Sequence, residues 1–315
     1  MNSQILPYLA TYASYLFIVI AYTVKVVKIA RMPLHLRWEL YPIAHEKNYK
    51  YGGSYLEEME WWNKPRQKNS LRGILFKVRD YFTFPGYFSR NRSYWLGLYP
   101  WHIGFYLIVS FHIMSFLGAV FIVTTGINIS ADSLNVAGRV IYYLTLVCAS
   151  GSFILGSLGS IILLAKRLTD RGLRAYASAS NYFNYVFFLI VFLSGLFAWL
   201  LTDPTLSAYR DFWQSLITFK YAPVKPLAYT HILLFSFFLI YLPFTRSTHY
   251  ITKIFAFFGV LWDDMPNLKG KVFERQIKEA LKKQVSWSAP HIQSGKSWGE
   301  VATSGMPEDE ARTTK

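Results

Sequence analysis

The stretch LYPWHIGFYLIVSFHIMSFLGAVFIVTTGI, residues 98–127, decides the fold of this chain. It contains no Lys, Arg, Asp or Glu, but it carries two histidines, His102 and His112. A helix needs about 20 apolar residues to cross the hydrocarbon core of a bilayer. The stretch therefore predicts a transmembrane helix with two ionisable side chains inside it, and such side chains usually face the protein interior and mark function.

Four more stretches are long and apolar enough to span a membrane: Ile5–Ala30, Val140–Ala165, Tyr182–Leu201 and Leu227–Val260. The predicted fold is an all-α membrane protein with five transmembrane helices, the last kinked at Pro243, where a backbone N–H is missing. We divide the chain into residues 1–32 with the first transmembrane helix, a cytoplasmic loop region at 33–97, a four-helix membrane domain at 98–262 and a cytoplasmic tail at 263–315.

The composition agrees with a membrane protein. Of 315 residues, 53% are hydrophobic and 16% are charged, whereas ordinary soluble domains have about 25% charged residues. The 33 Lys and Arg exceed the 18 Asp and Glu by 15. Because basic residues beside apolar runs follow the positive-inside rule, we expect no nucleic-acid partner. The single cysteine, Cys148, excludes a disulfide scaffold and a cysteine-bound iron–sulfur cluster within this chain.

The basic residues predict an orientation. Twelve Lys and Arg lie between the first and second spans, four follow the third span within residues 166–174, and nine lie in the tail. The two other connections hold only Arg139 in one, and Arg210, Lys220 and Lys225 in the other. We expect the protein to lie in the cytoplasmic (inner) membrane. Because cytoplasmic loops carry the basic excess, its N-terminus should lie on the outer side of this membrane and its C-terminus on the cytoplasmic side.

The fifth span carries His231 and His249, eighteen positions apart, and the second carries His102 and His112, ten apart. Because the two helices run in opposite directions, the histidines form two levels, His102 with His249 near the inner face and His112 with His231 toward the outer face. Two haem b groups stacked across a membrane need two such pairs of axial imidazoles. At 100° per residue, the eighteen positions between His231 and His249 return to the same helix face. The ten positions between His102 and His112 leave these two side chains about 80° apart around the helix axis.

Some neighbouring features have two interpretations. Arg246, one turn before His249, either binds haem propionates or anchors the inner end of the span. Gly151, Gly156 and Gly159 either allow close helix packing or make room for a porphyrin. An amphipathic helix expected at Leu268–Gln284 lies either on lipid or against a cytoplasmic partner. We expect His35, His45 and His291 to be ordinary surface histidines.

The motifs WHIGFYLIVSFH (residues 101–112), THILLF (230–235) and PFTRSTH (243–249) resemble the respiratory nitrate reductase gamma-subunit superfamily of dihaem cytochrome b membrane subunits. The resemblance implies that His102, His112, His231 and His249 are the four haem ligands. These nitrate reductase subunits have a lysine near the quinone site, twenty residues after the outer-haem ligand of the second helix. Asp132 stands at that position here, so no quinone contact is assigned.

Within the superfamily, the long first loop and the tail around Ser288–Glu300 are most similar to DsrM, the membrane cytochrome b of the sulfite-reduction-associated complex. This resemblance implies an electron-transfer subunit of a quinol-oxidising complex, catalytic only with its partners. Menaquinone would exchange electrons near the outer haem, and a cytoplasmic iron–sulfur, heterodisulfide-reductase-like subunit would exchange them inside. Further membrane and periplasmic subunits are also implied.

Three other functions remain open from the sequence. They are the cytochrome b subunit of a nitrate-reductase-like complex, a haem-free proton-coupled transporter, and a membrane anchor for a soluble enzyme. Buried histidines can relay protons in a transporter, but the five spans show no paired inverted repeat. An anchor would not need four histidines in the membrane.

Overall fold

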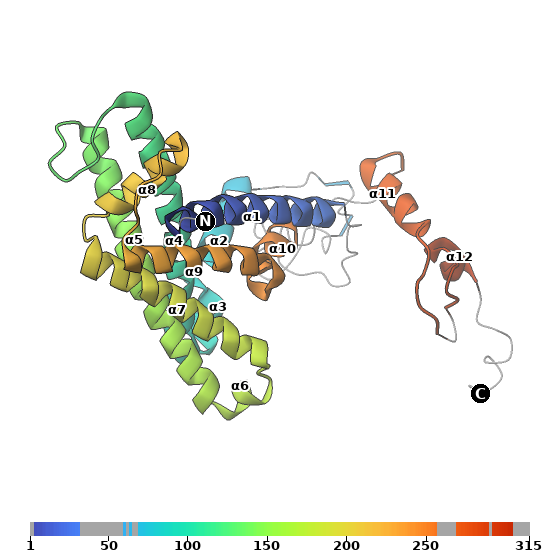
Figure 1. The fold of residues 1–315 in the computed structure, drawn as a ribbon. Coiled ribbons are helices and arrows are strands. Elements are labelled where there is room, and N and C mark those ends of the chain that lie inside the picture. The colour runs from blue at the N-terminus through green and yellow to red at the C-terminus, as the bar shows by residue number, and fades with distance from the viewer. Residues whose placement is uncertain are drawn as a thin grey trace. The chain divides into compact units, whose positions relative to one another are not determined.

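The computed structural model describes residues 3–31, 59–60, 63–64, 69–256, 269–289 and 292–304. Within these residues every regular element is a helix (Figure 1). The chain divides into two compact units. One consists of Met1–Thr23 and Leu75–Thr248, and the other of Val24–Ile74 and His249–Lys315.

Five helices are long and apolar enough to cross a membrane: α1 (Leu6–Ala30), α4 (Arg92–Thr125), α5 (Val136–Thr169), α7 (Ala179–Thr202) and α9 (Pro226–Tyr241) with the 3-10 turn that extends it to Phe244. The prediction of five membrane-spanning helices is confirmed. The shorter helices are α2 (Ser70–Thr83), α3 (Pro85–Arg90), α6 (Arg171–Ala175), α8 (Ser207–Thr218), α10 (His249–Ala256), α11 (Val272–Leu281) and α12 (Trp298–Thr303).

Large apolar side chains cover the outside of the long helices. Leu16, Val147 and Leu201 are 64%, 61% and 70% exposed. Leaving one such side chain in water rather than burying it costs about 1.5–3 kcal/mol. So many exposed apolar side chains are tolerable only where the surrounding solvent is lipid, and the chain is therefore a multi-pass membrane protein.

Glycines allow α4, α5 and α7 to approach closely. A Cβ at Gly104 of α4 would overlap the backbone of Gly156 on α5, and one at Gly159 would overlap the backbone of Trp101. The next helix makes similar contacts, because a Cβ at Gly195 of α7 would collide with the ring of Phe153. The close-packing interpretation of the α5 glycines is thus supported by their contacts.

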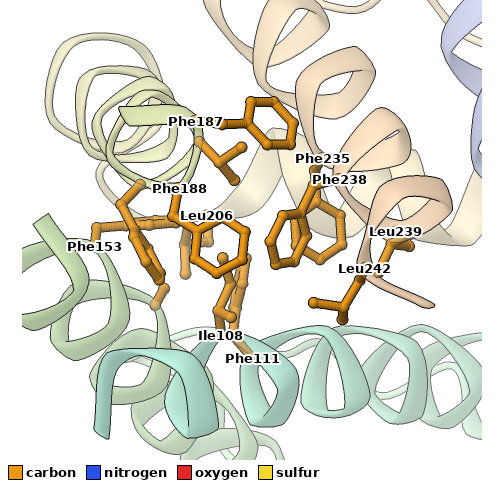
Figure 2. Close-up of a cluster of buried hydrophobic side chains, with 13 residues drawn as sticks. Ile108, Phe111, Phe153, Phe187, Phe188, Leu206, Phe235, Phe238, Leu239 and Leu242 are labelled. Carbon is orange, nitrogen blue, oxygen red and sulfur yellow. The ribbon is translucent and has the colours of Figure 1, made fainter. Parts of the chain in front are cut away.

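A cluster of aromatic side chains fills the space between α4, α5, α7 and α9 (Figure 2). Phe111, Phe153, Phe188 and Phe238 are each at most 3% exposed. The rings of Phe188 and Phe238 meet edge to face, with centroids 4.9 Å apart. Aromatic pairs in this geometry add to the free energy gained from burial alone, so the cluster holds the four helices in register around the site described below.

Asparagine caps extend two helices beyond the predicted spans. The side chain of Asn91 accepts a hydrogen bond from Tyr94 N at the start of α4, and that of Asn135 accepts one from Gly138 N at the start of α5. Asparagine is among the best N-cap residues because its side chain satisfies a backbone donor that has no partner in the helix. Both helices consequently begin before the apolar run does.

The predicted fifth helix, Leu227–Val260, is wrong as a single kinked helix. Helix α9 ends at Tyr241, two 3-10 turns cover Leu242–Phe244 and Arg246–Thr248, and α10 begins at His249. The cause is Pro243, which has no N–H to donate and whose ring clashes with the carbonyl of Leu239 in a continuous helix. Thr245 stabilises the break, since its hydroxyl donates to Leu242 O over 2.8 Å. Residues beyond Ala256 in this stretch lie outside the described ones.

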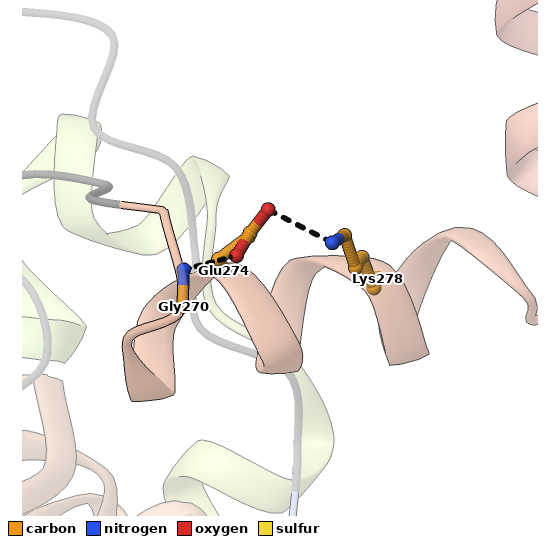
Figure 3. Close-up of polar contacts among 3 residues, drawn as sticks. All are labelled: Gly270, Glu274 and Lys278. Carbon is orange, nitrogen blue, oxygen red and sulfur yellow. Dashed lines mark hydrogen bonds and ion pairs between the residues drawn. The ribbon is translucent and has the colours of Figure 1, made fainter.

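Helix α11 belongs to the second unit and forms within the amphipathic segment predicted at Leu268–Gln284. The Glu274 carboxylate accepts a hydrogen bond from Gly270 N over 2.6 Å and pairs with Lys278 over 2.8 Å (Figure 3). These two contacts, the Lys278 ammonium first, lower the pKa of Glu274. The two predicted uses of α11, on lipid or against a cytoplasmic partner, stay predictions.

Candidate functional site

Helices α1, α4, α8 and α9 enclose a small cavity inside the first compact unit. Two imidazoles line it, His112 from α4 and His231 from α9, together with the aromatic side chains Tyr15, Tyr209, Trp213 and Phe235. Both histidines are buried, at 6% and 4% exposure. The structure therefore brings together the two histidines that the sequence assigns to one level of the membrane.

His112 is held by the helix that carries it. Its Nδ1 lies 2.7 Å from the carbonyl oxygen of Ile108, one turn earlier in α4. A carbonyl oxygen only accepts, so Nδ1 carries the proton and Nε2 keeps its lone pair. This Nε2 is buried and has no hydrogen-bond partner.

His231 is held by the neighbouring helix. Its Nδ1 lies 2.9 Å from Ser194 Oγ on α7. The Ser194 hydroxyl donates its proton to the carbonyl of Val191 over 2.8 Å, so its oxygen accepts from His231 and Nδ1 is the protonated nitrogen. Nε2 of His231 is also buried without a hydrogen-bond partner.

The two buried Nε2 lone pairs in one apolar cavity are expected to bind a ligand. Each unsatisfied acceptor costs about 1–3 kcal/mol, which a metal bond to nitrogen would offset. Among the described residues no group of three or more His, Cys, Asp or Glu side chains gathers to hold a metal ion. A haem iron needs only two axial ligands from the protein, and a hydrogen-bonded Nδ1 with a bare Nε2 is the usual state of a metal-ligating histidine.

The donor atoms fit a haem, but the present side-chain positions leave it little space. The Phe235 ring stacks on the His112 imidazole with centroids 3.8 Å apart and planes 7° from parallel. The cavity volume is about 10 Å³, enough for one water-sized group. A porphyrin therefore enters only when aromatic side chains such as Phe235 turn aside.

His102 repeats the arrangement of His112 ten residues earlier on α4. Its Nδ1 lies 2.9 Å from the carbonyl oxygen of Leu98, again one turn back. The imidazole is half-buried beside Phe84, with ring centroids 4.6 Å apart. Along a straight helix the two histidines are about 15 Å apart.

His249 belongs to a different compact unit from the other three histidines of the predicted haem sites. His249 is exposed as the first residue of α10 and belongs to the second unit, whereas His102 belongs to the first. The argument that His231 and His249 share a helix face does not apply, because the helix is broken between them. Arg246 is exposed in the 3-10 turn Arg246–Thr248. The pairing of His249 with His102, and a propionate role for Arg246, stay predictions.

Helix α8 is the part of the site that the sequence analysis missed. It places Tyr209, Phe212 and Trp213 against the cavity. Its buried residues Phe212, Trp213 and Leu216 recur at the spacing of one face of an amphipathic helix. This pattern in the connection after the fourth span could have predicted the helix. Ser194, which orients His231, had no such signal. His35, His45 and His291 lie outside the described residues.

A family model described as nitrate reductase gamma subunit matches residues 83–262, more than half of the chain and all four histidines discussed here. Comparisons with curated proteins and with solved structures found no match. The family consists of membrane cytochrome b subunits that bind haem and transfer electrons in multi-subunit oxidoreductase complexes. The chain belongs to the nitrate reductase gamma subunit family.

Proposed function

We propose that the chain is a dihaem cytochrome b that carries electrons between menaquinone near the outer membrane face and a cytoplasmic iron–sulfur subunit. His112 and His231 hold the outer haem, and His102 and His249 hold the inner one. The observation that carries the proposal is the pair of buried Nε2 atoms of His112 and His231, which line one cavity with both Nδ1 protons already engaged.

When bound, haem supplies a one-electron carrier whose potential depends on its ligands and surroundings. The residues of the chain orient the ligating imidazoles and exclude water from the site. Ile108 O and Ser194 Oγ fix the imidazole tautomers, and hydrogen bonds to Nδ1 raise the basicity of the ligating Nε2. The aromatic cluster around the cavity keeps water away from the site, which lowers the local dielectric.

The proposed inner haem site, His102 with His249, is supported by fewer observations than the outer one. His102 makes the same Nδ1 contact to a carbonyl as His112 does, and His249 is the remaining histidine of the family-like motifs. The proposed direction of the helices, with the N-terminus outside, rests on the alternation of basic connections. It puts the cavity of His112 and His231 toward the outer face, where menaquinone would exchange electrons.

The partner assignment follows the resemblance to the DsrM branch, which implies a heterodisulfide-reductase-like iron–sulfur subunit in anaerobic sulfur respiration. A nitrate-reductase-like complex is the second candidate, because the matching family is described by that enzyme. Copurification of the chain from its native membrane separates the two, since the partners of the two complexes differ in mass and cofactors.

The ligand assignment is tested by single substitutions in the purified full chain. We expect His231→Ala to remove the outer haem and leave the inner one, and His102→Ala to do the reverse. His291→Ala is the matched control and should keep both haems. Haem content and redox titration give the readout, with an unchanged gel-filtration profile as the check on folding. Retention of both haems in folded His231→Ala protein would contradict the assignment.

A further inference from the structure

Arg210 of α8 is a buried cation that forms no ion pair with any carboxylate among the described residues. Its side chain is 7% exposed, and Nη1 has no hydrogen-bond partner. A buried guanidinium in this state is strongly unfavourable unless something negative binds to it.

The carboxylates of Asp203 and Asp211 attract the guanidinium through their charge, but neither forms an ion pair with it within 4.0 Å. Asp203 is near, but its carboxylate accepts hydrogen bonds from Ser207 Oγ over 3.2 Å and Tyr209 N over 2.9 Å, and so caps α8. The guanidinium lies over the ring of Tyr142 on α5, 5.4 Å from its centroid. A cation over an aromatic face is stabilised, but the buried Nη1 donor of Arg210 still needs an acceptor.

Arg210 does not itself line the cavity of the two histidines, but it belongs to α8, which covers one side of that cavity. Its sequence neighbour Tyr209 lines that cavity, and so does Trp213, one turn later on α8. A Cβ on Gly118 of α4 would meet Ile141 on α5, so Tyr142 is level with about Leu117 of α4. Leu117 is five residues beyond His112, or about 8 Å along the helix, in the direction away from His102.

We propose that Arg210 binds a propionate carboxylate of the haem held by His112 and His231. Haem b carries two carboxylates on one edge, and the guanidinium fork matches a carboxylate with two parallel N–H···O bonds. Arg210 thereby positions the haem and fixes which edge faces α8. This inference rests on the proposed function, because it needs haem at this cavity.

The first test compares Arg210→Gln with Lys220→Gln in the purified haem-loaded chain. Both substitutions remove one positive charge from the connection between α7 and α9, but Lys220 is exposed. We expect Arg210→Gln to lower the potential of the outer haem, changing its ratio of reduced to oxidised forms tenfold, or 59 mV for one electron. The freed propionate should also make that potential depend on pH near neutrality.

Lys220→Gln and the inner haem should show neither change. Equal outer-haem potentials in the two variants would overturn the propionate contact and leave Arg210 to another anion, such as a lipid phosphate. Wild-type protein without an outer haem would instead refute the proposed function. The two failures are therefore distinguishable.

A second variant covers the case in which Arg210→Gln does not fold. Arg210→Lys keeps the charge but loses the two parallel hydrogen bonds. With haem labelled at the propionate carbons, the redox-difference infrared spectrum of the wild type should contain a band of an ionised carboxylate, and Arg210→Lys should shift it. An unshifted band would overturn the proposal.

Discussion

The hydroxyl of Ser194 does for His231 what a helix carbonyl does for His112. Its oxygen on α7 accepts a hydrogen bond from Nδ1 of His231 on α9, because the hydroxyl proton is donated to Val191 O. A hydrogen bond from Nδ1 to a neighbouring oxygen orients a ligating imidazole and strengthens its bond to a metal. The orientation of His231 thus depends on the packing of α9 against α7.

Substituting Ser194→Ala removes that acceptor. We expect the outer haem to bind about 10–100-fold more weakly, as when other metal-ligating histidines lose the acceptor of their Nδ1 proton. Its potential should rise because His231 becomes a weaker electron donor to the iron. Ser152→Ala is the control, since Ser152 is also buried but bonds only to Ala149 O of its own helix. Haem titration of both variants measures the effect, and equal affinities would contradict the role of Ser194.

At the scale of elements, the break between α9 and α10 separates the two histidines of the fifth predicted span. The apolar sequence around Pro243 favours one long helix, and a kinked helix was the expectation. The residues after the proline decide otherwise, because the hydroxyls of Thr245 and Thr248 bond to carbonyls three residues back and stabilise 3-10 turns. A hydropathy profile does not register these hydrogen bonds between threonine side chains and the backbone, so the sequence analysis could not predict the break.

Replacing Pro243→Ala restores the missing N–H donor and should favour a continuous helix through residue 249. We expect the direction of His249 to change, so that the inner haem is lost or its potential shifts while the outer haem stays. Pro226→Ala is the control, because a proline at the first turn of α9 blocks no helical hydrogen bond. Redox titration separates the two haems. An unaltered inner haem in the Pro243 variant would mean that the break does not position His249.

At the scale of the whole molecule, the sequence predicted what depends on composition and long patterns. Five apolar runs became five long helices, because the bilayer leaves a spanning backbone almost no other structure. The sequence also pointed to His112 and His231, which meet at one cavity. It could not reveal that Ser194 contacts His231 or that Arg210 is buried against Tyr142, since each contact joins residues that are distant in sequence.

The orientation of the molecule is a prediction that single cysteines can check. With Cys148→Ser as background, we expect Lys220→Cys to react with a membrane-impermeant maleimide on intact cells. Arg171→Cys and Lys278→Cys should react only after permeabilisation, because the basic connections lie inside. The reverse labelling pattern would contradict the orientation with the N-terminus outside.

The most direct measurement for the central claim is the number of haem b groups per chain in the purified wild-type protein, determined from the pyridine haemochrome spectrum and the protein concentration. We expect two haems per chain, each held by one pair of histidines and separable by redox potential. A folded preparation with no haem b, or with a single haem that survives substitution of both His112 and His231, would contradict it.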